Sequence, residues 1–160
     1  MKKILLADMD KCNGCELCVD ACSMSHGGFC SLSNSRIRIL REEPTAQFAP
    51  LMCEQCGEHP CQDACPVKAI VFDPELSLLT VDPELCVACG DCVEACPYQG
   101  IFLGEETALK CDLCGGDPAC AGLCHTGALR VVEVSPQTVA SGLDRKQAKL
   151  HFIERNRHAH

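Results

Sequence analysis

Sixteen of the 17 cysteines in this 160-residue chain fall into four groups of four. The first and third groups share the spacing C-x2-C-x2-C-x3-C, whereas the second and fourth have two and three extra residues before their third cysteine. The groups are Cys12, Cys15, Cys18 and Cys22; Cys53, Cys56, Cys61 and Cys65; Cys86, Cys89, Cys92 and Cys96; and Cys111, Cys114, Cys120 and Cys124. Repetition of one four-cysteine pattern indicates four copies of the same kind of site.

This spacing is typical of cysteines that hold [4Fe–4S] clusters. Two-residue steps let the backbone turn around a cubane cluster, and in the bacterial C-x2-C-x2-C-x3-C-P run the fourth cysteine ligates the other cluster of a pair. Four zinc sites are a weaker interpretation, because a tetrahedral ribbon site does not need a third cysteine two residues on. Disulfides are disfavoured by the odd cysteine count and by an expected reducing compartment. We therefore expect four [4Fe–4S] clusters.

The segment between Cys65 and Cys86 indicates which groups pair. Residues 69–72 and 78–81 are short apolar runs bounded by Asp-Pro turns, which predicts a hairpin joining groups two and three. The economical topology is nested, with a unit of groups two and three inserted into a unit of groups one and four. The resulting ligand sets are Cys12, Cys15, Cys18 and Cys124 for site 1; Cys111, Cys114, Cys120 and Cys22 for site 2; Cys53, Cys56, Cys61 and Cys96 for site 3; and Cys86, Cys89, Cys92 and Cys65 for site 4.

The expected fold is α+β, with two nested ferredoxin-like units of short hairpins and short helices, followed by a C-terminal helix or arm. The outer unit comprises residues 1–52 and 97–134, the inner unit residues 53–96, and the basic arm residues 135–160. The chain contains no Trp, one Tyr and five Phe, so it lacks the aromatic surface that usually anchors a core of this size. We expect the clusters to replace that core as the centres of folding.

Local runs around the cysteines resemble a known protein family. They are Cys53-Glu54-Gln55-Cys56, His59-Pro60-Cys61, Cys65-Pro66, Cys86-Val87-Ala88-Cys89-Gly90-Asp91-Cys92 and Lys110-Cys111-Asp112-Leu113-Cys114. With the order of the groups, they look like the four-cluster electron-transfer subunits of molybdenum and tungsten enzymes, such as the iron–sulfur subunits of dimethyl sulfoxide reductase and formate dehydrogenase. Residues 35–39 make the chain similar to the small iron–sulfur subunits of tungsten aldehyde oxidoreductases. The resemblance covers residues 1–134.

The resemblance implies the nested ligand sets and a relay of single electrons without substrate chemistry. The implied partners are a catalytic oxidoreductase subunit, with a tungsten or molybdenum pterin aldehyde oxidoreductase favoured, and a second redox protein such as a flavoprotein. Carbon monoxide dehydrogenase, formate dehydrogenase and hydrogenase are alternative partners. A cluster-folded scaffold and a zinc-folded interaction module are alternatives of other classes. No nucleotide fingerprint, Ser/His/Asp set or carboxylate pair stands out, so we expect no enzyme activity.

The charge balance argues against nucleic acid as a partner. The formal net charge is −8, and four cluster sites at about −2 each bring the loaded protein to roughly −16. Nucleic-acid binding needs a basic surface instead. No apolar run is long enough for a membrane span, and only four apolar residues precede Asp8, so we expect a cytoplasmic protein.

Basic residues concentrate at the C-terminal end of the chain. Five of the 14 Lys and Arg residues lie there: Arg145, Lys146, Lys149, Arg155 and Arg157. A moderate helical stripe accompanies them: Val139, Leu143, Leu150 and Ile153. This tail is either a helix packed on the acidic body of its own chain or a docking arm for a partner or for another copy of the chain.

Several residues near the groups carry separate expectations. Cys30, outside every group, is expected to be a small buried hydrophobe, with a substitute ligand or a redox sensor as alternatives. Ser23 and His125 stand where simple ferredoxins have proline after the fourth cysteine, which loosens the backbone. Tyr98 and Phe102 are expected to shield a cluster from water. Histidines close to cysteines are expected to have surface or hydrogen-bonding roles: His26, His59 and His125.

Overall fold

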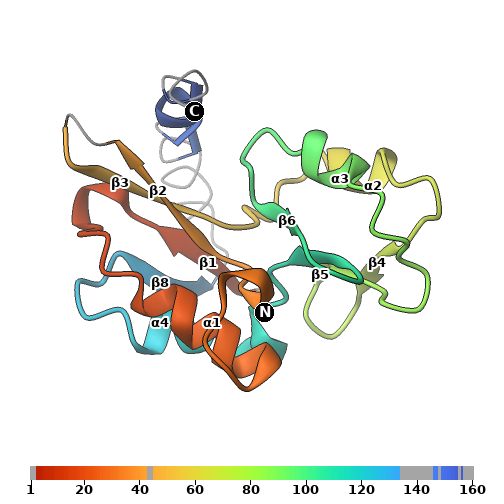
Figure 1. Cartoon of the computed structure of the whole chain (residues 1–160), viewed down its shortest axis with the longest axis horizontal. Helices are drawn as coiled ribbons and strands as arrows, with labels where there is room; N and C mark the ends of the chain where they lie inside the picture. Colours follow the sequence, from red (N-terminus) through yellow and green to blue (C-terminus); the bar gives the residue numbers. More distant parts are fainter. Residues whose placement is uncertain (1–2, 43–44, 134–145, 148, 155, 157–160) are drawn as a thin grey trace.

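The computed structural model describes residues 3–42, 45–133, 146–147, 149–154 and 156. Its strands form four antiparallel two-stranded sheets (Figure 1). The pairs are β1 (Lys3–Ala7) with β8 (Leu129–Glu133), β2 (Arg38–Glu42) with β3 (Gln47–Leu51), β4 (Ile70–Asp73) with β5 (Leu78–Val81), and β6 (Ile101–Leu103) with β7 (Ala108–Lys110). Because β1 pairs with β8, the two ends of the cysteine-bearing region lie side by side.

Each cysteine group contributes one α-helix that contains its third cysteine. The helices are α1 (Leu17–Gly27), α2 (Pro60–Asp63), α3 (Asp91–Glu94) and α4 (Ala119–Gly122), and the 3-10 turns are η1 (Met9–Lys11), η2 (Leu32–Asn34) and η3 (Leu113–Gly116). Helices α2 and α3 end just before Pro66 and Pro97, because a residue that precedes proline avoids helical backbone angles. None of the described helices has the length and apolar character that a membrane crossing requires.

The four groups are distributed over two lobes (Figure 1). In one lobe α1 packs against α4 beside the β1–β8 pair, and in the other α2 packs against α3 beside the β4–β5 pair. The expected hairpin between groups two and three is present as β4–β5. At its turn, Asp73 Oδ1 accepts hydrogen bonds from the backbone of Glu75 and Leu76. The α+β fold with short hairpins and short helices is confirmed.

Cysteine side chains belong to two apolar cores. The first core contains Cys18, Cys22 and Cys120 from groups one and four, packed with Leu5, Val19, Ile37, Met52 and Leu129. The second contains Cys61 and Cys92 from groups two and three, packed with Ile70, Leu79, Ile101 and Ala108. Two of these residues, Ile101 and Ala108, lie outside residues 53–96. The division of the chain at those residues stays a prediction.

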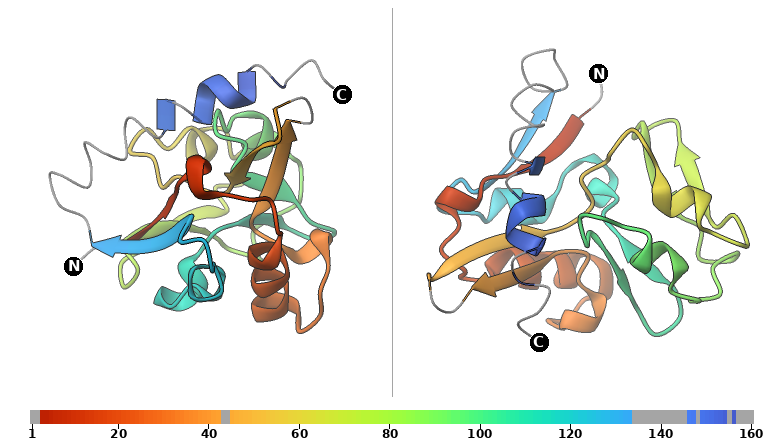
Figure 2. Two further views of the ribbon diagram at one scale, coloured as in Figure 1. Left: turned by 90° about the vertical axis from the view of Figure 1, so that its left-hand side faces the viewer. Right: turned by 90° about the horizontal axis from the view of Figure 1, so that it is seen from above.

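The described part of the C-terminal segment is helical and packs on the body of its own chain. Figure 2 shows this helix, formed by residues 146–147, 149–154 and 156, lying over the β2–β3 pair. Phe152 and Ile153, which are 2% and 1% exposed, form a third core with Ala49, Leu51 and Phe102. This packing agrees with the first interpretation of the tail. Val139 and Leu143 of the expected stripe lie outside the described residues.

Candidate metal centres

Two cavities are each lined by four cysteines drawn from two sequence groups. The cavity in the α1–α4 lobe is lined by the set expected at site 1: Cys12, Cys15, Cys18 and Cys124. The cavity in the α2–α3 lobe is lined by the set expected at site 4: Cys65, Cys86, Cys89 and Cys92. In each cavity the fold brings one cysteine of a distant group to three cysteines of a local one. The assignment of these residues as ligands stays a prediction.

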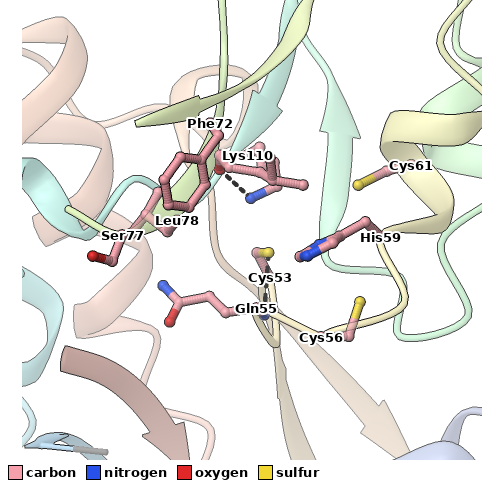
Figure 3. A pocket seen from close by; sticks show the side chains of 10 residues that line it. Cys53, Gln55, Cys56, His59, Cys61, Phe72, Ser77, Leu78 and Lys110 are labelled. Atoms are coloured by element: carbon pink, nitrogen blue, oxygen red, sulfur yellow. Dashed lines mark hydrogen bonds between the residues drawn. The ribbon is translucent and has the colours of Figure 1, made fainter. Parts of the chain in front are cut away.

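A third cavity contains three of the four cysteines expected at site 3. Figure 3 shows Cys53, Cys56 and Cys61 around one space, together with His59 and Lys110. Burial, and then the neighbouring Cys53 and Cys56, raise the pKa of Cys96. This electrostatic coupling indicates that Cys96 lies beside the same space.

The set expected at site 2 also lies together. Burial, and then the neighbouring Cys22 and Cys114, raise the pKa of Cys120 to about 12. Burial also raises the pKa of Cys111, and the neighbouring Cys120 adds to this rise. Within this set Cys22 lies in α1, Cys114 in η3 and Cys120 in α4, and Cys111 directly follows β7.

The chemistry of these donor sets fits iron–sulfur clusters. All 17 cysteines are free, so the described residues contain no disulfide. Burial raises the pKa of Cys18 to about 12 and that of Cys61 to about 11, so without a metal these thiols keep their protons at pH 7. A coordinating metal deprotonates such thiols outright, and cubane clusters use four thiolates each. Buried sulfurs gathered in fours therefore suit this cofactor.

The backbone around each group is shaped to face the sulfurs. A backbone N–H donates to the fourth cysteine Sγ of every group: Arg36 to Cys22 at 3.3 Å, Ala69 to Cys65 at 3.2 Å, Gly100 to Cys96 at 3.4 Å and Leu129 to Cys124 at 3.2 Å. The residue before the second cysteine has a positive φ in every group: Gly14, Gln55, Ala88 and Leu113. Left-handed angles at non-glycine residues cost energy, and they tend to occur at functional sites. The spacing of the cysteines does not predict which backbone N–H groups donate to their sulfurs.

Comparison with known proteins places this arrangement in a family. Residues 44–134, more than half of the chain, match the 4Fe–4S dicluster domain, and residues 9–25 match a 4Fe–4S binding domain. The chain belongs to the 4Fe–4S dicluster domain family. Together with the 17 cysteines of the chain, the two matched regions fit four [4Fe–4S] clusters. The ferredoxin-like family expected from the sequence is confirmed.

Three relatives of this chain show the kinds of protein to which it is similar. The first is the polyferredoxin-like subunit of an aliphatic sulfonate oxidoreductase from Pyrococcus furiosus, 40% identical over 133 residues that cover 80% of this chain and 76% of the relative. The second is subunit beta of an NADH-dependent phenylglyoxylate dehydrogenase from Aromatoleum evansii, 38% identical over 127 residues that cover 77% of this chain and 28% of that subunit. The third is the protein NrfC from Escherichia coli strain K12, 36% identical over 141 residues that cover 78% of this chain and 62% of NrfC.

Site 2 of the dicluster protein is bordered by a charged hydrogen-bond network. His26 Nδ1 lies 2.7 Å from the Cys22 carbonyl oxygen, and His26 Nε2 lies 3.1 Å from Asp112 Oδ1. Arg36 donates to the other carboxylate oxygen of Asp112. Hydrogen bonds to Asp112, and then to Cys22, raise the pKa of His26 to about 10. The hydrogen-bonding role expected for His26 is confirmed, whereas its partner Asp112, 86 residues away, was not predicted.

Cys30 is exposed, so the expectation that it is a small buried hydrophobe is wrong. Helix α1 ends at Gly27, and Gly28, with a left-handed φ of 74°, caps it and terminates the helical path of the chain. In the loop that follows, the neighbouring Phe29 is 56% exposed as well. The functional alternatives for Cys30, a substitute ligand and a redox sensor, stay hypotheses.

Ser23 tightens the backbone rather than loosening it. Its side chain is buried, donates to the Phe29 carbonyl oxygen at 2.6 Å and accepts from the Ser31 N–H at 2.7 Å. Because serine permits helical angles at the preceding cysteine, α1 continues beyond group one, unlike α2 and α3. His125 is exposed, and its Nε2 lies 3.4 Å from Asn13 Nδ2.

The two aromatic residues expected to shield a cluster lie in different places. Burial, and then the neighbouring Cys56, raise the pKa of Tyr98, so this ring lies beside site 3. Phe102 instead packs in the core that contains Phe152 and Ile153, and the Arg38 guanidinium carbon lies 4.3 Å from its ring centroid. No cysteine belongs to that core among the described residues. The shielding role expected for Phe102 is therefore corrected, because β6 faces the C-terminal helix there.

Gly100 allows a close approach of two backbone segments at site 3. A Cβ at this position would lie 2.1 Å from the Met52 carbonyl oxygen and 2.7 Å from the Cys53 nitrogen. We expect Gly100→Ala to destabilise the protein by about 1–3 kcal/mol, because the backbone that carries Cys53 must move. Thermal unfolding measures this loss. Gly57→Ala is the matched control, since a Cβ there meets nothing within 4 Å; equal melting temperatures for the two variants would contradict the prediction.

Proposed function

We propose that this dicluster protein is a non-catalytic electron-transfer subunit that relays single electrons through four clusters. The proposed ligands are Cys12, Cys15, Cys18 and Cys124 at site 1; Cys111, Cys114, Cys120 and Cys22 at site 2; Cys53, Cys56, Cys61 and Cys96 at site 3; and Cys86, Cys89, Cys92 and Cys65 at site 4. The gathering of each set from two sequence groups carries this proposal. When bound, a [4Fe–4S] cluster supplies one-electron redox chemistry.

Neighbour relations between the sites support a linear relay. Adjacent sites have cysteines that lie near one another: Cys18 with Cys120, Cys111 with Cys53, and Cys61 with Cys92. The sites therefore follow one another in the order 1, 2, 3 and 4. The chain contributes the spacing of the sites, the exclusion of water from the inner ones and the N–H donors to the fourth cysteines.

Both ends of this row reach the surface. Cys15 at site 1 and Cys89 at site 4 are exposed, whereas the other proposed ligands are buried or half-buried. Beside Cys89, Val67 and Val87 line the site 4 cavity and are 39% and 61% exposed. Apolar side chains around an exposed ligand let a docking partner exclude water from the contact. We assign one partner contact to each end of the row.

The proposed partners are a catalytic oxidoreductase subunit and a second redox protein such as a flavoprotein. Two relatives, an aliphatic sulfonate oxidoreductase subunit and a phenylglyoxylate dehydrogenase subunit, support a catalytic oxidoreductase as one partner. The sequence resemblance favours a tungsten or molybdenum pterin aldehyde oxidoreductase, with carbon monoxide dehydrogenase, formate dehydrogenase and hydrogenase as alternatives. The net charge of −8 before clusters favours basic partner surfaces, and association is expected to slow as salt rises.

Anaerobic co-purification of the native complex tests this proposal. We expect a catalytic oxidoreductase subunit to be retained at low salt, and its substrate to reduce the clusters of this chain during turnover. The visible absorbance of the clusters follows that reduction. Clusters that remain oxidised throughout turnover would contradict the relay and would favour the alternative of a cluster-folded scaffold.

A further inference from the structure

Lys110 is a buried lysine that is not one of the proposed cluster ligands. It lies at the end of β7, directly before Cys111, and is 4% exposed. Its ammonium group donates to the Leu79 carbonyl oxygen. An ammonium has three donors, yet within the described part of the chain no carboxylate pairs with Lys110. A buried charge of this kind requires a compensating anion nearby.

The sulfurs of site 3 are the anions within reach of Lys110. Figure 3 shows the Lys110 side chain extending into the space that Cys53 and Cys61 border, where it lines the same cavity. Burial raises the pKa of Cys61 to about 11, and the positive charge of Lys110 opposes this rise. On its other side, Lys110 is joined by a peptide bond to Cys111 of site 2. The ammonium therefore lies beside site 3, while the backbone of Lys110 leads directly into site 2.

We propose that Lys110 stabilises the reduced state of site 3 by holding a fixed positive charge beside its cysteines. This inference rests on the proposed function, because it requires a cluster at site 3. Each arriving electron adds one negative charge, and a buried cation close by attracts that charge with little screening by salt. The hydrogen bond to Leu79 holds the ammonium in place, so it need not reorient when the charge arrives. The cluster at site 3 is thereby kept reducible.

Redox titration of the iron-loaded protein, followed by electron paramagnetic resonance, tests this inference. Lys110→Met removes the charge at similar volume. We expect the cluster at site 3 to become harder to reduce, with its reduced-to-oxidised ratio at a given potential falling about tenfold, which is about 59 mV for one electron. Lys110→Arg retains the charge and is expected to keep that ratio within about twofold of the wild type.

The matched control is Lys68→Met, which removes an exposed lysine near Cys65 of site 4. Solvent and salt screen this charge, so we expect less than about a twofold change in the ratio. A similar small change in loaded Lys110→Met would overturn the inference. Absence of clusters from the wild-type protein would instead overturn the proposed function.

If a Lys110 variant fails to load iron, comparison of three variants still tests whether the positive charge of Lys110 is required. Lys110→Gln provides a second neutral side chain that can still donate a hydrogen bond to the Leu79 carbonyl. Normal loading of Lys110→Arg alone, with loss of loading in both neutral variants, would support a requirement for the charge beside site 3. Failure of all three variants to load would show that the shape of the lysine matters rather than its charge, and would overturn the inference.

Discussion

Removal of iron is expected to unfold this protein rather than merely inactivate it. One apolar core contains Cys18, Cys22 and Cys120, and another contains Cys61 and Cys92. Without bound metal, these sulfurs lose the bonds that would join the distant segments carrying them, and the chain has few aromatic side chains to compensate. Because the free energy of metal binding is then folding free energy, its loss should exceed the roughly 5–15 kcal/mol that stabilises an ordinary domain.

Far-ultraviolet circular dichroism, recorded with the iron content, measures this loss. An oxidant with a chelator removes the clusters, and the chelator alone is the control that leaves them in place. Anaerobic addition of iron and sulfide to the unfolded chain is expected to restore the spectrum. An iron-free protein that still melts cooperatively at the temperature of the loaded one would contradict the prediction.

Breaking the ion pair between Lys149 and Glu54 is expected to have the second largest effect. The two side chains are 3% and 7% exposed. Lys149 belongs to the C-terminal helix, whereas Glu54 directly follows Cys53 of site 3. Removal of either partner leaves a buried charge unpaired, which costs about 3–5 kcal/mol. We therefore expect Lys149→Met and Glu54→Gln each to lower the urea concentration at which the loaded protein unfolds.

The Arg41–Glu16 ion pair provides the matched control. Its side chains are 47% and 43% exposed, so Glu16→Gln is expected to cost less than about 1 kcal/mol. The double variant of Lys149 and Glu54 should recover part of the stability that either single variant loses, because it leaves no unpaired charge. If Glu54→Gln is no more destabilising than Glu16→Gln, the C-terminal helix does not depend on this contact.

Local sequence signals predicted the features that depend on neighbours in the chain. The β4–β5 hairpin could be read from the Asp-Pro turns at its ends, whereas the spacing of the cysteines did not predict that each group's helix contains its third cysteine. The meeting of groups one and four was also expected, because the fourth cysteine of such a run serves the partner cluster. The hairpin needs only a few adjacent residues, whereas the pairing of the groups follows from the cysteine pattern that repeats along the chain.

Contacts between distant residues gave no comparable signal. Lys149 and Glu54 are 95 residues apart and Arg36 and Asp112 are 76 residues apart, so neither pairing could be predicted from the sequence. Cys30 was expected to be buried from its residue type, but its place after the glycines that end α1 decides its exposure. Charge and hydrophobicity patterns indicate whether a side chain tends to be buried or exposed, whereas the packing of the two lobes determines which residue it contacts.

Anaerobic reductive titration of the purified protein, with the electrons taken up per chain counted against its metal and sulfide content, tests the central claim most directly. Four reducible [4Fe–4S] clusters predict about four electrons, about sixteen iron atoms and about sixteen sulfides per chain. Zinc without sulfide, or iron that takes up no electrons, would contradict an electron relay through these four sites.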